Sequence, residues 1–522
     1  MSATATLNVP TSCTAKKTLN IPLNRVEGDL EIRIELADGR VVDAWSSGTM
    51  YRGIENILVG RGPLDGLVIT PRICGICTTA HLTAASKALD AIAGIQPPPD
   101  AVRVRNLALT TESLQSDVRQ TFLTFAADFA NPAYRERPLF EEACRRYTPL
   151  KGETAIEVIR QTKRVLEIVA ILGGQWPHSS YMVPGGIATV PSLADLLQCR
   201  HLLAAYRSWY ETRILGCPIE RWREVRSQAG LDGWLEESAA HRDSDLGFFI
   251  RFAREIGLDH IGRGHGNFLS FGQLDLPPDT QVRGRGGATD YLIPAGFARG
   301  SEVSAFDQAK VAEHVAHSWY VDYAGGRHPS AGQTQPYATG AESQKYSWAK
   351  APRYDGLPAE TGPLAEMVIA RHPLFLDFLA QGPNAFVRQL ARLVRPAELM
   401  PAMEQWLSEI TPDGTFYIPT PAISEGEGIG TTQAARGALG HWVKIADAKI
   451  QHYQIITPTA WNGSPRDSDD VRGPWEEALI GTPVADPANP VVLGHVVRSF
   501  DPCLVCTVHA LHRGRSLARQ PL

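Results

Sequence analysis

The chain has 522 residues, of which 43% are hydrophobic and 20% charged, so its composition excludes intrinsic disorder and a coiled coil. With a net charge of −5, the surface as a whole does not attract nucleic acid or an anionic membrane, so these partners are disfavoured. Eight cysteines are too few for a disulfide scaffold, the N-terminus lacks the apolar stretch of a secretory signal, and no apolar run is long enough for a transmembrane segment.

The first expected element is a β-hairpin at about residues 28–50. Apolar and charged residues alternate over 30–36, as they do in a strand with one buried face. Asp38 and Gly39 follow, and both tolerate the positive φ angles of a tight turn.

Long helices are expected next, and we assign residues of about 100–255 to a helical core. The first begins after Pro99, since the apolar residues from 107 to 129 are spaced by three, four or seven and form one stripe. Two more are expected at 154–172 and 192–215, and these helices should pack as a bundle.

The second half is expected to contain a loop-rich insert followed by further helices. Residues of about 258–356 are rich in glycine, proline, serine and threonine, and they predict long loops or a small β subdomain without a sustained strand. Helical periodicity returns at 363–410, and we extend this part of the helical core to 450. The predicted fold class is therefore α+β, mainly helical, with small peripheral sheets and long loops.

Two C-x-x-C pairs are the strongest chemical signal, Cys74 with Cys77 and Cys503 with Cys506. Four thiolates in two such pairs can bind one soft metal ion, and a structural zinc site is the simplest interpretation. Structural zinc usually holds a small local module together, whereas these pairs lie near opposite ends of the chain. The separation favours a site at the centre of a large fold.

Further sequence motifs lie around the two cysteine pairs and in segments spread over nearly the whole chain. The first pair lies in Arg72–His81 (RICGICTTAH) and the second in Asp501–His509 (DPCLVCTVH). Together with five further segments, they resemble the large subunit of nickel-iron hydrogenases. In chain order, those segments are Arg25–Gly28 (RVEG), Tyr51–Glu55 (YRGIE), Tyr346–Tyr354 (YSWAKAPRY), Ala435–Trp442 (ARGALGHW) and Ile456–Asn462 (ITPTAWN).

The resemblance implies a nickel-iron centre whose iron carries CO and cyanide. Cys74 and Cys503 would be terminal nickel ligands, and Cys77 and Cys506 would bridge nickel to iron. Dihydrogen is a very weak acid, so its heterolytic cleavage needs a soft electrophilic metal and a nearby base.

Other site residues also follow from the resemblance. Glu27 would accept the proton from Cys503, and Arg436, paired with Asp501, would lie over the open side of the metals. His81 would donate a hydrogen bond to a bridging cysteine. A magnesium or similar ion would be bound by Glu55, His509 and the carbonyl of Ile455.

The remaining cysteines are scattered, so we expect no iron-sulfur cluster in this chain and infer an obligate iron-sulfur small subunit that carries the electrons. Asp29, where many family members have histidine, resembles the cytosolic uptake and sensory branches. We therefore expect a cytoplasmic enzyme that oxidises H2. The alternatives are a hydrogen sensor with little turnover and a zinc-stabilised or metal-free scaffold.

The resemblance also divides the chain into a large-subunit domain, 1–509, and a C-terminal extension, 510–522. A maturation endopeptidase would remove the extension after His509. We expect the uncut extension to hold the segment bearing Cys503 and Cys506 away from the other pair.

Overall fold

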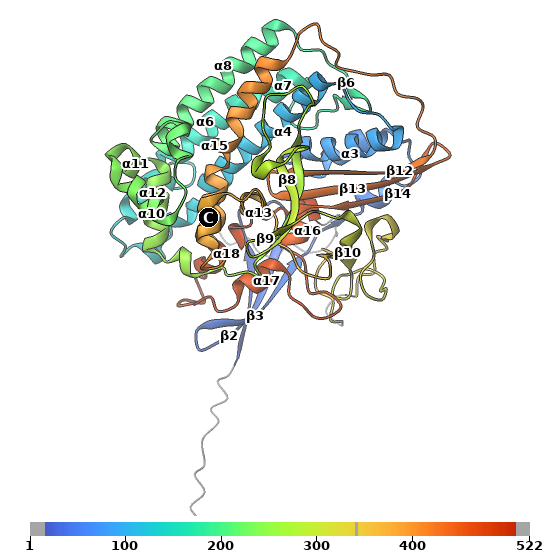
Figure 1. Cartoon of the computed structure of the whole chain (residues 1–522). Coiled ribbons are helices and arrows are strands. Elements are labelled where there is room, and N and C mark those ends of the chain that lie inside the picture. Colours follow the sequence, from blue (N-terminus) through green and yellow to red (C-terminus); the bar gives the residue numbers. More distant parts are fainter. Residues whose placement is uncertain (1–15, 340–342, 508–522) are drawn as a thin grey trace, which may run out of the picture.

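The structure, a computed structural model, describes residues 16–339 and 343–507, and the side chains of Cys506 and Thr507 lie outside that description. Helices form one side of the molecule, and small antiparallel sheets form the other (Figure 1). The fold class is α+β, as predicted. In the described ranges, no helix is both long and apolar enough to cross a bilayer.

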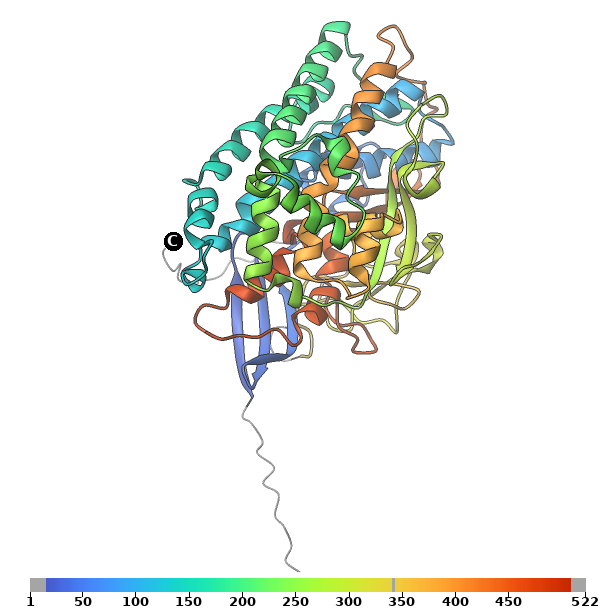
Figure 2. The same ribbon diagram turned by 60° about the vertical axis from the view of Figure 1, so that its left-hand side comes forward.

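The predicted helix bundle is confirmed. Its members are α4 (Pro99–Arg119), α6 (Glu153–Val165), α8 (Leu193–Trp209) and α15 (Ala385–Glu409), and Figures 1 and 2 show them packed against one another. Helix α8 begins at the expected cap, where the Ser192 hydroxyl accepts a hydrogen bond from the backbone N–H of Asp195.

Two predicted helices in this region have irregular continuations. The helix expected at 154–172 is divided, since α7 (Glu167–Gly173) starts again after Leu166. The stripe from 107 to 129 continues beyond α4 through a wider turn at Gln120–Phe125 and a tighter one at Ala126–Ala130.

The N-terminal hairpin is also confirmed, with β2 (Leu30–Ala37) and β3 (Arg40–Gly48) joined at Asp38 and Gly39. A third strand, β1 (Lys17–Leu23), pairs with β2 and was not predicted. This sheet projects from the lower end of the molecule (Figure 2).

The assignment of 363–450 to the helical core is wrong in its last part. Strands β12 (Gly426–Ala434), β13 (Gly437–Ala446) and β14 (Lys449–Ile456) form an antiparallel sheet. This sheet is not peripheral either, because β13 is buried along nearly its whole length and α3 (Thr78–Ala93) packs on β12.

At 258–356 the alternative of a small β subdomain is confirmed, but the expectation of no sustained strand is wrong. Strands β7 (Asn267–Asp275) and β8 (Tyr291–Arg299) are each nine residues long and pair with each other, and β9 (Glu302–Ser304) extends the sheet. β7 is buried along most of its length, so this sheet belongs to the core.

Shorter elements connect these parts. The remaining helices are α1 (Ile54–Leu58), α2 (Asp65–Ile69), α5 (Phe140–Tyr147), α9 (Ile219–Trp222), α10 (Gln228–Glu237), α11 (Ala239–Asp243), α12 (Asp245–Glu255), α13 (Pro363–Ile369), α14 (Pro373–Leu379), α16 (Pro458–Asn462), α17 (Pro474–Leu479), α18 (Val491–Arg498) and α19 (Leu504–Thr507). The remaining strands are β4 (Tyr51–Arg52), β5 (Met182–Val183), β6 (Gly186–Ile187), β10 (Val311–His314) and β11 (Ala351–Tyr354).

Candidate metal centre

The first cysteine pair and Cys503 of the second lie together although they come from opposite ends of the chain. Cys74 lies in the loop before α3, and Cys77 is the residue that precedes the first turn of this helix. Cys503 follows α18, and its backbone N–H donates to the Thr459 hydroxyl at 3.0 Å. The segment is fixed beside Glu27, whose carbonyl accepts the backbone N–H of Leu504 at 2.6 Å.

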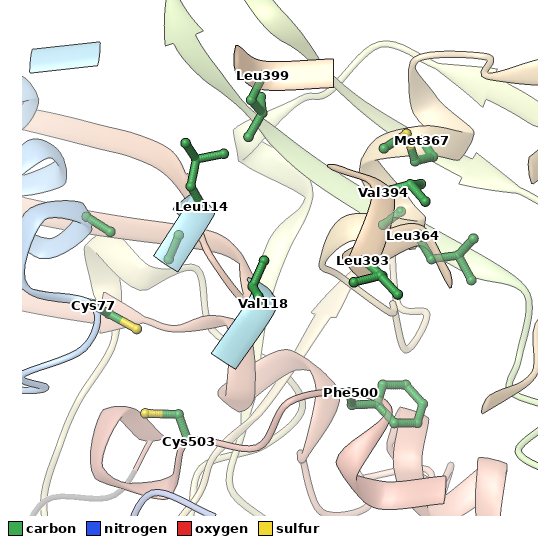
Figure 3. Close-up of a cluster of buried hydrophobic side chains, with 14 of the residues drawn as sticks. Cys77, Leu114, Val118, Leu364, Met367, Leu393, Val394, Leu399, Phe500 and Cys503 are labelled. Atoms are coloured by element: carbon green, nitrogen blue, oxygen red, sulfur yellow. The ribbon is translucent and has the colours of Figure 1, made fainter. Parts of the chain in front are cut away.

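Three sulfur atoms converge in the interior. The Sγ atoms of Cys74 and Cys503 are 3.5 Å apart, and together with Cys77 Sγ they all lie within 4.8 Å of one another. All three side chains are buried, and Figure 3 shows the sulfurs of Cys77 and Cys503 facing each other beside Leu114 and Val118. Converging buried thiols form a soft donor set that fits nickel, iron or zinc.

Arg436 lies against these sulfurs. Its Nη1 atom donates to Cys77 Sγ at 3.1 Å, and its Nε atom is 3.1 Å from Asp501 Oδ1. Burial opposes its charge, but Asp501 and the cysteines hold the pKa of Arg436 well above its ordinary value. The guanidinium is therefore a fixed positive charge beside the sulfurs.

Glu27 opens into a cavity of about 380 Å³ that is also lined by Arg436 and Asp501. Partial burial raises the pKa of Glu27; Arg436 lowers it, and Cys74 and Asp501 add to the rise. Gln115 and Ser116 line the same cavity, and their buried atoms Oε1 and Oγ have no hydrogen-bond partner in the described part of the protein. Such a polar cavity has room and partners for water beside the carboxyl.

The roles of two residues were missed by sequence reasoning. Arg52 donates hydrogen bonds to the carbonyls of Ile73 and Val505, each one residue before a cysteine of the two pairs. Glu112 accepts the backbone N–H of Thr79 at 2.8 Å at the start of α3. Arg52 lay in one of the family-like segments, but nothing in the sequence distinguished Glu112 from other helical glutamates.

His81 is buried and is linked to a second histidine, and its expected hydrogen bond to a bridging cysteine stays a prediction. Its Nδ1 atom is 3.1 Å from His441 Nε2, and His441 Nδ1 is 2.9 Å from the Tyr453 hydroxyl. Burial lowers the pKa of His81 to about 4; Cys74 opposes this shift and Arg52 adds to it. His81 is therefore neutral at pH 7, and the His441 contact fixes its ring.

The candidates for the second metal are brought together only in part. Glu55 Oε1 accepts the backbone N–H of Ile455 at 2.9 Å, while Glu55 Oε2 is 3.9 Å from Lys350 Nζ. The same lysine is 3.5 Å from a second buried carboxylate, Glu313. These oxygen atoms suit a hard cation, but the predicted third ligand, His509, lies outside the described residues.

The expectation that the uncut extension holds the second pair away concerns residues 510–522, which lie outside the described residues. Cys503 itself lies beside Cys74, with the two Sγ atoms 3.5 Å apart, and backbone contacts with Glu27 and Thr459 fix this segment.

Within the ranges that the structure describes, the sulfur trio is the one cluster with the geometry of a metal site. Cys144, Cys199 and Cys217 are free cysteines outside it.

Comparisons with known proteins agree with this geometry. The sequence pattern of the nickel-dependent hydrogenases matches residues 52–134 and 249–509. The periplasmic NiFeSe hydrogenase large subunit of Desulfomicrobium baculatum is 35% identical over 528 residues, covering 94% of this chain and 94% of that protein. The uptake hydrogenase large subunit of Rhodobacter capsulatus is 29% identical over 574 residues, with the same two coverages, 94% and 94%.

The fold is likewise similar to solved structures. A reduced, active form of the NiFeSe hydrogenase from Desulfomicrobium baculatum superposes with a TM-score of 0.79 at 31% identity, covering 95% of this chain and 100% of that one. The reduced-state NiFeSe hydrogenase of D. vulgaris Hildenborough gives a TM-score of 0.78 at 30% identity, with the same coverages of 95% and 100%.

Proposed function

Because the chain belongs to the nickel-dependent hydrogenase family, we propose that it is a catalytic large subunit that oxidises H2 to two protons and two electrons. The observation that carries this proposal is the buried trio of sulfurs with Arg436 beside it. The direction of turnover is supported by relatives that are uptake hydrogenases.

The cysteines fit the metal centre by the chemistry of their donor atoms. Cys74 and Cys503 would hold nickel, and Cys77 with Cys506 would join nickel to an iron bearing CO and cyanide. When bound, this centre supplies the soft electrophile at which the H–H bond is polarised.

The chain's own residues then handle the proton. Cys503 Sγ is the base that takes it, and Glu27, which is fixed next to Cys503 by backbone pairing, receives it. Burial raises the pKa of this carboxyl, which makes it a better proton acceptor than an ordinary glutamate, and the polar cavity it lines would take the proton next.

Arg436 supplies a fixed positive charge in this reaction. Asp501 holds its guanidinium at 3.1 Å, so the positive charge stays fixed above the sulfurs and stabilises negative charge as it develops there. His81 orients this side of the site through its contact with His441.

A second divalent ion, magnesium by its preference for oxygen ligands, is proposed at Glu55, the carbonyl of Ile455 and His509. Support comes from the position of Glu55 beside the Ile455 backbone, whose N–H its Oε1 atom accepts at 2.9 Å. Metal analysis that gives no magnesium beyond buffer background would contradict this assignment.

The electrons require a partner. We propose an iron-sulfur small subunit in an obligate heterodimer, because the described cysteines outside the trio form no further cluster that could hold iron. Copurification of the two subunits, with iron above the one atom expected here, tests this proposal.

A cytoplasmic location is proposed from the Glu27-Gly28-Asp29 segment alone. The Desulfomicrobium relative is periplasmic, so the proposal needs its own experiment. Fractionation of cells is that experiment, and recovery of the chain with periplasmic markers would overturn the proposal.

The central test is metal content combined with H2-dependent dye reduction by the purified heterodimer. We expect one nickel and one iron per large subunit, infrared bands of CO and cyanide, and turnover. Stoichiometric zinc without such bands would contradict the proposal, and full metal content with little turnover would favour the hydrogen sensor.

Cys503→Ser sharpens this test. A hydroxyl at neutral pH is not an anionic soft ligand, so the variant should lose nickel and activity together. Cys144→Ser is the matched control, because Cys144 is partly exposed on α5 and lies outside the sulfur trio. It should keep both metals.

A further inference from the structure

A second cavity, separate from the metal centre, is lined mainly by cationic side chains. It has a volume of about 320 Å³ and lies between α15, the α13–α14 turn, strand β8, the segment after α9 and the glycine-rich loop at 284–287. Four arginines and one histidine line it with two carboxylates. These residues are Arg223, Arg226, Arg285, Arg371, His372, Glu366 and Glu398.

The two carboxylates do not balance the four arginines. Glu366 is already used outside the cavity, since its oxygens accept Arg395 Nη1 at 2.8 and 3.0 Å. Glu398 alone then faces Arg285 at 2.8 Å, Arg223 at 3.6 Å and His372 at 4.0 Å. Two arginines and one histidine therefore share the single carboxylate of Glu398.

The other two arginines have no acidic partner at all within the described part of the chain. Both Arg226 and Arg371 are exposed residues that line the cavity, and neither forms an ion pair there. The cavity therefore carries excess positive charge. Burial lowers the pKa of His372, and its arginine neighbours, among them Arg226, add to that shift.

One donor of the lining arginines is also left without a partner. Arg285 Nε is buried and has no hydrogen-bond acceptor among the described residues. A buried donor without an acceptor is costly, and a nearby anion would offset part of that cost through its charge.

The backbone around the cavity brings the glycine-rich loop and the α13–α14 turn together. Arg371 has a φ of 56°, a left-handed conformation that is unusual for arginine, at the tight turn between α13 and α14. Gly286 packs on this turn, since a Cβ atom there would lie 3.1 Å from the Ala370 carbonyl. Arg285 on the loop and Arg371 on the turn therefore line the same cavity.

We propose that this cavity is a binding site for a compact, multiply charged oxyanion, a small molecule that carries phosphate or carboxylate groups. The planar guanidinium groups match both kinds of oxyanion, and several of them together favour more than one negative charge. The volume suits a small metabolite and is too small for a folded partner. Nothing in the proposed hydrogen chemistry uses these residues.

The test is calorimetric binding to the purified heterodimer, with pyrophosphate, inorganic phosphate and citrate as probes and chloride at matched ionic strength as the reference. Pyrophosphate or citrate should bind with a stoichiometry of one and raise the melting temperature, because a ligand that binds only the folded state stabilises it. The more effective probe distinguishes a phosphate-bearing from a carboxylate-bearing ligand.

The double variant Arg226→Gln/Arg371→Gln should weaken binding of that probe by about tenfold or more, since it removes two cationic donors of charge-assisted hydrogen bonds. Both arginines are exposed and without ion pairs in the described structure, so folding and H2-dependent dye reduction should be unchanged. Arg160→Gln is the matched control, an exposed arginine on α6 that does not line the cavity.

Three results would overturn the proposal. One is equal affinity of the probe for the double variant and the wild type. Another is no saturable binding beyond that of chloride at the same ionic strength. The third is binding to the isolated large subunit but not to the heterodimer, which would mean that a protein partner covers the arginines.

Discussion

The buried charges around the sulfurs form one connected chain of ion pairs. Asp501 joins Arg436 at 3.1 Å and Arg392 at 3.2 Å, and Arg392 in turn lies 3.1 Å from Asp117. Both Asp117 and Arg392 are almost completely buried. Removing one member of such a chain leaves an unpaired charge in the interior, so these residues fix the orientation of Arg436.

Glu27→Gln isolates the proton step at the scale of a single residue. The amide has nearly the shape of the carboxyl but cannot release a proton, so the variant should retain nickel, iron and the infrared bands while losing at least 100-fold in turnover and H2/D2 exchange. Asp29→Asn, two residues along the chain, is the control and should exchange at the wild-type rate. Wild-type turnover in Glu27→Gln would exclude it as the relay.

At the scale of elements, helices of the bundle could be predicted because each has a long apolar stripe, and α8 also has its serine cap. The sheet β12–β14 could not be predicted from the sequence. Its first strand carries Gly426, Gly428 and Gly430, and β13 is buried on both faces, so neither shows the alternation that identifies a half-exposed strand.

The glycines of β12 have a packing reason that only the structure reveals. A Cβ atom at Gly430 would lie 1.8 Å from the Ala84 carbonyl, and one at Gly428 would lie 2.2 Å from the Ala88 carbonyl. Helix α3 thus rests directly on the strand backbone. Because Cys77 immediately precedes α3, this close contact also sets the position of the sulfur.

Gly430→Ala should therefore displace α3 and disturb the metal centre. Overpacking of this kind costs about 1–3 kcal/mol or more, and we expect a lower melting temperature together with reduced nickel content. Gly233→Ala is the control, since no atom lies within 4 Å of its added Cβ and alanine favours the helix α10. Equal nickel content in the two variants would contradict this account of the β12 glycines.

The candidate site, like the fold, could be predicted from the sequence only in part. Cys74, Cys77 and Cys503 were predicted as partners from their spacing and the resemblance, and the structure brings these three together. Glu112 was not predicted, because a carboxylate on a helix is usually solvated and its role depends on the backbone N–H of Thr79 from another helix. Contacts of that kind leave no local pattern in a sequence.

Helix α17 has a built-in pH dependence through Glu476. Its Oε1 atom accepts the backbone N–H of Ser46 at 2.8 Å and the Tyr346 hydroxyl at 2.9 Å, so it joins α17 to β3. Burial raises the pKa of Glu476 from 4.5 to about 7, and the hydrogen bonds and Arg466 oppose this rise. Between about pH 4.5 and 7, the folded protein therefore keeps a proton on Glu476 that the unfolded chain has lost.

Because of this difference in proton binding, the stability of the folded protein falls as the pH rises. The stabilisation is fully present below pH 4.5 and is lost as the pH rises through about 7, a change of roughly 3 kcal/mol. Glu476→Gln keeps an oxygen acceptor for both bonds and does not titrate. Its melting temperature should fall less than that of the wild type between pH 5 and 8, measured by scanning calorimetry. Parallel curves would show that Glu476 is ionised throughout this range.

At the scale of the whole molecule, the two ends of the chain are joined at the metal centre. Glu27 pairs with the backbone beside Cys503, and Arg52 donates to carbonyls of both cysteine segments. Gly28 permits this approach, since it has a φ of 88° and a Cβ atom there would lie 2.9 Å from the Val505 backbone nitrogen. The centre can therefore form only when the chain is nearly complete.

This topology gives the C-terminal extension a defined point of action. The chain beyond His509 carries Arg513, Arg515 and Arg519 but no apolar stripe, and the family pattern also ends at residue 509. Since Cys503 is already fixed by Glu27 and Thr459, removal of the extension would act on the last part of the segment, which includes Cys506 and His509. Cleavage after metal insertion would then fix this last part of the segment at the metal centre.

We therefore predict that the active, nickel-loaded protein ends at His509 and that 510–522 is removed by an endopeptidase. Intact mass spectrometry of the heterodimer measures this directly, and a chain that stops at residue 509 from the outset is the control. That shortened chain should accumulate with little nickel if the extension is needed while the metals are inserted. An active heterodimer whose large subunit retains Ala510–Leu522 would contradict the prediction.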